Sequence, residues 1–198
     1  MTARFPVRSR ILHWLTALLV FAALLIGFFM VNAVGSYGAL MDVHMTIGIT
    51  ILVVVIVRIV NRFTAKPPNW PPTIGRLEGK IISYSERLMY LLLVAQPLVG
   101  WAMVSATGRS AVVFGFPLPR IAPFDDGVFF ALRQIHSVLA YLLVIVIAAH
   151  VSGVLLHTIA LRDGILSRMT FGLRGGSDGA PVLEDTAQRQ QPSSGASA

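Results

Sequence analysis

The sequence contains no cysteine. This absence excludes disulfide bonds, iron–sulfur clusters held by thiolates, covalently attached c-type haem and any thiol nucleophile. Charged residues are also scarce, at 13% of the chain, whereas a typical soluble domain carries about 25%. Hydrophobic residues make up 55% of the chain and the mean hydropathy is +0.73. This composition excludes an ordinary soluble domain and indicates a membrane protein.

Long apolar stretches account for most of the chain. Each is close to or above the ~20 residues that a helix needs to cross ~30 Å of hydrocarbon. The sequence therefore predicts an all-α membrane fold, a four-helix transmembrane bundle. Its single domain would cover residues 1–171, and a Gly-, Ser- and Gln-rich tail, 172–198, is expected to be disordered. The predicted spans are 11–31, 42–61, 84–106 and 128–160.

The distribution of Lys and Arg predicts the orientation of the spans. Thirteen of these residues flank the start of the first span, the connection between spans two and three, and the end of span four. Only Arg109, Arg120 and Arg133 lie on the other side. Positive charge is retained on the cytoplasmic side of membrane proteins, so both termini are expected in the cytoplasm.

Histidines near the ends of the spans are the main candidates for function. An ionisable side chain in an apolar span is costly and marks a candidate site. His136 and His150 are 14 residues apart, so they share a face of span four and differ in depth by ~21 Å. In depth, His13 matches His150 and His44 matches His136. Two matched imidazole pairs are what two bis-histidine haems require.

These histidines have two other interpretations. They could be core side chains that hydrogen-bond to neighbouring helices. They could also hold zinc or a two-metal centre, but zinc requires its ligands around one point. These residues lie at two levels, and no matched carboxylates accompany them. The haem interpretation is therefore favoured.

Cations near the histidines could bind haem propionates. Arg10 and Arg133 each lie one turn before a candidate ligand, and Arg58 lies 14 residues after His44. The alternative is that these side chains snorkel to lipid headgroups. Small residues, including Gly48 one turn from His44, would permit close approach of a flat cofactor, and Gly100 could admit a close neighbour. Small-residue packing between membrane helices has the same signature.

His157 follows His150 by seven residues on nearly the same helix face. It is expected at the cytoplasmic interface beside the inner haem. There an imidazole could donate a hydrogen bond or a proton to a quinone head group. Alternatively, it is an interfacial histidine that faces water.

Four segments of this chain resemble the bacterial cytochrome b561 family of di-haem membrane cytochromes. They are RILHWLTALL at 10–19, HMTIGITILVVVIVRIVNR at 44–62, LMYLLLVAQPLVGWAM at 88–103 and IHSVLAYLLVIVIAAHVSGVLLHTIALRDGILSRM at 135–169. The resemblance implies two haems b, ligated by His13, His44, His136 and His150, in a bacterial inner membrane. Some members are superoxide oxidases that pass electrons from superoxide to ubiquinone, and His157 corresponds to the position that contacts quinone there.

The expected function is therefore transmembrane electron transfer, with oxidoreductase activity of the superoxide oxidase kind. Expected partners are the lipid bilayer, ubiquinone, and either a small anionic donor such as superoxide or a redox protein. No nucleic-acid partner is expected. Two alternatives remain open: a cytochrome b subunit that anchors a soluble dehydrogenase or hydrogenase, and a non-redox four-helix membrane protein.

Overall fold

The computed structural model describes residues 4–32, 35, 37–65, 74–162 and 165–171. Within this part of the chain lie four long helices: α1 (Val7–Asn32), α2 (Tyr37–Thr64), α3 (Arg76–Ala106) and α4 (Asp126–Leu155). All four are long and apolar enough to cross a membrane. The predicted four-helix membrane fold is confirmed. The tail predicted at 172–198 and the proline-rich stretch at 67–72 lie outside the described residues.

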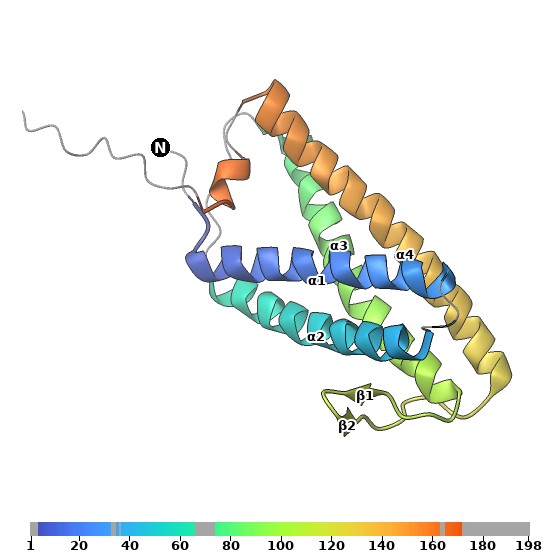
Figure 1. Cartoon of the computed structure of the whole chain (residues 1–198). Helices are drawn as coiled ribbons and strands as arrows, with labels where there is room; N and C mark the ends of the chain where they lie inside the picture. The colour runs from blue at the N-terminus through green and yellow to red at the C-terminus, as the bar shows by residue number, and fades with distance from the viewer. Residues whose placement is uncertain (1–3, 33–34, 36, 66–73, 163–164, 172–198) are drawn as a thin grey trace, which may run out of the picture.

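Helices that are consecutive in the chain are neighbours in the bundle. α1 packs against α2, α2 against α3, and α3 against α4 (Figure 1). The chain reverses direction at each connection, so one end holds the start of α1, the end of α2, the start of α3 and the end of α4 (Figure 1). We call this the His13 end and the opposite one the His44 end.

α3 starts at Arg76, eight residues before the predicted span. The extra residues, Arg76 to Ser83, include three charged side chains, and hydropathy therefore does not detect them. They are helical partly because Glu78, in the first turn, accepts a hydrogen bond from the backbone N–H of Gly75 at 3.3 Å. A carboxylate in the first turn also complements the helix dipole. α3 therefore extends well beyond its apolar part at the His13 end.

The fourth predicted span is divided into two helical forms. Its start is capped by Asp125, whose side chain accepts from the N–H of Val128 at 2.8 Å. α-helical geometry ends at Leu155 and continues as a π-helical turn, η2 (Leu156–Ala160). A short 3-10 helix, η3 (Leu166–Arg168), follows. Single π turns are rare and often occur at functional positions, and this one contains His157.

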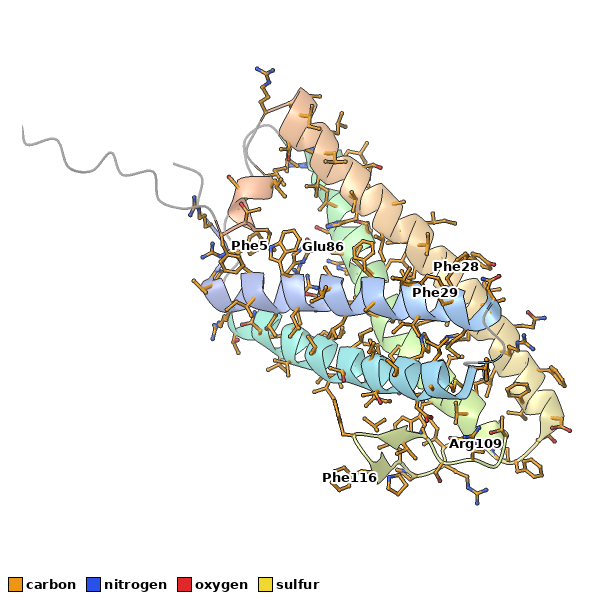
Figure 2. All side chains as sticks on the ribbon, viewed as in Figure 1. Phe5, Phe28, Phe29, Glu86, Arg109 and Phe116 are labelled. Atoms are coloured by element: carbon orange, nitrogen blue, oxygen red, sulfur yellow. The ribbon has the colours of Figure 1, made fainter. Side chains whose placement is uncertain are left out.

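The long loop between α3 and α4 forms a small hairpin, which the sequence analysis did not predict. Strand β1 (Val112–Val113) pairs antiparallel with β2 (Phe116–Pro117). Its turn uses positive φ angles at Phe114 and Gly115. Strand β1 contacts α2, and its Val113 is buried. Phe114 and Phe116 are exposed, and Figure 2 labels Phe116 on the hairpin at the His44 end.

The main core lies at mid-height of the bundle and is entirely apolar. All four helices contribute to it, with Val20 from α1, Ile51 and Val55 from α2, Leu92 and Leu93 from α3, and Leu143 and Val146 from α4. Val55 is fully buried. On α4, the two core residues lie between His136 and His150 in the sequence, so this layer separates the two histidine levels.

Candidate cofactor site

His13 of α1 and His150 of α4 face each other at the His13 end. Their ring centroids are 6.4 Å apart, with an angle of 57° between the ring planes. The two residues are far apart in the sequence and lie on helices that are not consecutive. The fold therefore brings together the first of the two imidazole pairs that were expected from their matching depth.

His44 of α2 and His136 of α4 form the second pair, nearer the start of α4 than His150. Their ring centroids are 6.3 Å apart and the interplanar angle is 77°. At the ideal rise of an α-helix, ~1.5 Å per residue, the two α4 histidines are separated by ~21 Å along the helix. The four histidines therefore form two pairs at two levels.

Two glycines contact the second pair. A Cβ atom at Gly27 of α1 would lie 3.4 Å from Cε1 of His44, and one at Gly100 of α3 would lie 3.1 Å from Cε1 of His136. At Gly100 a larger residue would require His136 to shift, whereas the 3.4 Å contact at Gly27 is at the edge of ordinary van der Waals contact. Gly100 thus has the close neighbour that was expected. Gly48 instead faces Pro97, where an added Cβ would make an ordinary 3.9 Å contact.

Gln96, one turn before Gly100 on α3, also contacts His136. Its side-chain amide donates to the backbone carbonyl of His136 at 3.1 Å and lies 3.3 Å from the ring Nε2. Its contact with the histidine backbone fixes the position of α4 relative to α3 at this level.

The residues at the two levels fit a haem group. An imidazole nitrogen binds a metal ion at about 2 Å, so one ion between two facing rings would hold their centres roughly 6 Å apart. Both observed separations match this value. Nδ1 of His44 and Nδ1 of His136 are buried and lack a hydrogen-bond partner among the described residues. No three His, Asp or Glu side chains of the described ranges converge on one point, so the donors occur as opposed pairs.

Arg58 of α2 lies at the first pair. Its Nη2 is 2.9 Å from Nδ1 of His13, and its guanidinium stacks on the ring of Tyr90 at 5.4 Å. The sequence analysis placed Arg58 at this level by counting along α2, and the structure has it there. Its role towards a propionate stays a prediction.

The other two predicted propionate ligands lie in different surroundings. Arg10 is buried, donates to the carbonyl of Thr170 at 3.0 Å and stacks on Phe171 at 4.8 Å. Trp14 donates to the carbonyl of Met169 at 3.0 Å, so residues 165–171 are held against the start of α1. Arg133, by contrast, is exposed on α4 at the His44 end. Propionate binding by either arginine stays a prediction.

His157 is buried in the π-helical turn, with 6% of its surface exposed. Its Nε2 lies 2.7 Å from Oε1 of Glu78, whose side chain is 40% exposed. The alternative interpretation, in which His157 faces water, therefore does not hold in this structure. Glu78 was missed by the sequence analysis, because nothing in the pattern links two positions 79 residues apart.

The chain is similar to several known proteins. The family model of the prokaryotic cytochrome b561 matches residues 4–172. The chain is 31% identical over 169 residues to a probable superoxide oxidase CybB of Yersinia pestis, covering 83% of this chain and 94% of that protein. It is 29% identical over 171 residues to cytochrome b561 homolog 2 of Escherichia coli (strain K12), covering 84% and 90% respectively.

The family match covers all four membrane helices and all five histidines. Four apolar helices with paired imidazoles are also the donor set that a b-type cytochrome needs. The chain belongs to the prokaryotic cytochrome b561 family of membrane electron-transfer proteins, and haem b is the cofactor that this membership implies.

Proposed function

We propose that this protein passes electrons across the membrane through two haems b, from superoxide at the His44 end to ubiquinone at the His13 end. The observation that carries the proposal is the pair of facing imidazoles at each of two levels. In this proposal His13 and His150 ligate one haem, and His44 and His136 ligate the other. Haem supplies one-electron redox chemistry when bound, and the protein fixes its ligands and surroundings.

His13 with His150, and His44 with His136, would each hold one haem between two imidazoles. Superoxide and quinone would then exchange electrons at the edges of the bundle without binding to the metal. Gly27 and Gly100 would let the rings of His44 and His136 lie close to α1 and α3, and Gln96 would hold α4 in register with α3. The residues therefore act by positioning rather than by covalent chemistry.

The distribution of charge supports the orientation. Among the described residues, ten Lys and Arg lie at the His13 end and three at the His44 end. By the positive-inside rule, the His13 end would face the cytoplasm. At the His44 end, exposed Arg109 and Arg120 would raise the encounter rate with a small anion, whereas exposed Asp125 and Asp126 at the same end oppose this effect. The superoxide assignment also draws on the Yersinia pestis relative, which bears that name.

At the His13 end, His157 and Glu78 would serve the quinone. Two superoxide anions would each give up one electron and become molecular oxygen, and ubiquinone would take the two electrons with two protons to become ubiquinol. His157 is buried and Glu78 is partly exposed, so together they connect a buried site to solvent by one 2.7 Å contact. Such a pair can donate a proton to a bound quinone and take up another proton from water.

The decisive experiment is a haem count with a spectrum. Purified protein should give a pyridine haemochrome ratio of about two haems per chain and a low-spin reduced-minus-oxidised spectrum. A ratio of one would leave a single site and contradict the transmembrane path. The absence of haem would favour the non-redox alternative.

A further inference from the structure

The start of α3 carries an open groove of about 390 Å³ at the His13 end. Three cations line it: Arg76, Lys80 and Arg87. They are spaced four and seven residues apart, which places them along one face of the helix. Ser83 and Tyr84 add hydroxyl groups to the same wall, and the guanidinium of Arg87 stacks on the ring of Tyr84 at 5.5 Å.

The acidic residues of this part of α3 are engaged elsewhere. Glu78 contacts His157 of η2, and Glu86 forms an ion pair with Arg62 of α2 at 2.9 Å. Within the described ranges, no carboxylate makes a salt bridge with any of the three groove cations. The groove therefore has an unbalanced positive charge and suits an anion.

The length of α3 sets the depth of this groove in the membrane. Its 31 residues span ~46 Å, about 16 Å more than the hydrocarbon thickness. The apolar part begins at Leu88 and continues to Ala106. The excess is therefore the segment from Arg76 to Arg87, which would lie among the lipid phosphates.

An exposed apolar stripe runs beside the groove and on along the helix. Leu77, Ile81, Leu88 and Leu91 are all exposed, at spacings of four, seven and three residues. Leu77 and Leu91 are 74% and 64% exposed. A ligand whose charged group binds in the groove could therefore place an apolar chain against this stripe. A free phosphate ion would use only the cations.

We propose that this groove binds the phosphate of an anionic glycerophospholipid, whose acyl chains lie along the apolar stripe of α3. The cations supply the charge, as basic pockets on membrane proteins do for acidic lipids. Tyr84 fixes the guanidinium of Arg87 over its ring. The site is separate from the histidine pairs, and the proposal does not depend on the electron path.

The test counts lipids on the haem-loaded protein by native mass spectrometry. The protein is titrated with phosphatidylglycerol, with phosphatidylcholine as the zwitterionic comparison. The wild type should retain phosphatidylglycerol preferentially. The variant R76Q/K80Q/R87Q should lose it, with affinity falling about fivefold for each cation removed. The control R4Q/R8Q/R162Q removes the same charge from the same end and should retain the lipid.

Three results would overturn the proposal. One is equal loss of lipid in the groove variant and the control, which would show a general charge effect. Another is displacement of the lipid by equimolar inorganic phosphate, which would show a site for the free ion. The last concerns folding: if the triple variant does not load haem, the single exposed variant K80Q decides, and unchanged retention there contradicts the proposal.

Discussion

Nη2 of Arg58 lies 2.9 Å from Nδ1 of His13, although the residues are on different helices and 45 positions apart. A guanidinium only donates hydrogen bonds, so in this contact Nδ1 is the acceptor. The Arg58 charge is therefore held at the ring that we propose as a haem ligand. Tyr90 fixes it there from α3.

We predict that R58Q lowers the midpoint potential of the haem at the His13 level. A positive charge this close favours the reduced state, and its removal should shift the potential by on the order of 50 mV or more. Spectroelectrochemical titration measures both haems, and the one at the His44 level serves as an internal reference. R58K should keep most of the wild-type value. Equal shifts of both potentials would argue against a local effect.

Removal of one histidine should empty one level. H150A should lose the haem at the His13 level and keep the other, so the haemochrome ratio falls from about two to one. H136A should do the opposite, and the two variants should differ in their reduced spectra. If both variants lose the same haem, the two pairs do not act as separate sites.

Gly100 offers a test without changing any ligand. In G100A the new Cβ would lie 3.1 Å from Cε1 of His136, so the ring must shift. We expect partial loss or a spectral shift of the haem at the His44 level only. G48A is the matched control, because its Cβ would lie 3.9 Å from Pro97. If G100A and G48A have the same spectrum and haem content, His136 does not need this space.

The pair of His157 and Glu78 should matter for quinone and not for haem content. H157A and E78Q should both retain two haems but reoxidise more slowly with a short-chain ubiquinone in stopped-flow measurements. D126N is the control, since Asp126 is also a first-turn carboxylate but lies at the other end of the bundle. Unchanged reoxidation in both variants would place the quinone elsewhere. Loss of haem in H157A would make His157 a ligand.

Superoxide should reduce the protein rapidly, and the rate should fall as ionic strength rises. Electrostatic steering of an anion by exposed arginines has this signature. R109Q/R120Q should slow the reaction at low salt and approach the wild type at high salt. Reduction no faster than spontaneous dismutation would point to a protein donor instead.

The sequence predicted the helices and the histidine pairs because both depend on simple periodicity. Apolar runs mark membrane spans, and a rise of 1.5 Å per residue converts spacing into depth. The same reasoning could not find the start of α3 at Arg76, since Arg76 to Ser83 include three charged side chains and are helical for local reasons. Hydropathy indicates whether a segment lies in lipid or in water, and not whether its backbone is hydrogen-bonded as a helix.

Other parts of the candidate site depend on tertiary contacts. Glu78 meets His157 only after α3 and α4 pack, and Gln96 meets His136 in the same way. Gly27 carried a weak signal, because it is a glycine near the end of α1 that reaches the level of His44. These contacts depend on how the helices pack, and a single sequence gives little information about helix packing.

The apolar layer formed by Val20, Val55, Leu143 and their neighbours has a consequence for energetics. Along the proposed path, each electron crosses this low-dielectric layer without an accompanying proton. Its transfer therefore moves charge through the transmembrane field, which is worth up to about 2.3 kcal/mol per 100 mV for a full crossing. Turnover in vesicles would thus be electrogenic, and an imposed voltage would speed or slow it according to its sign.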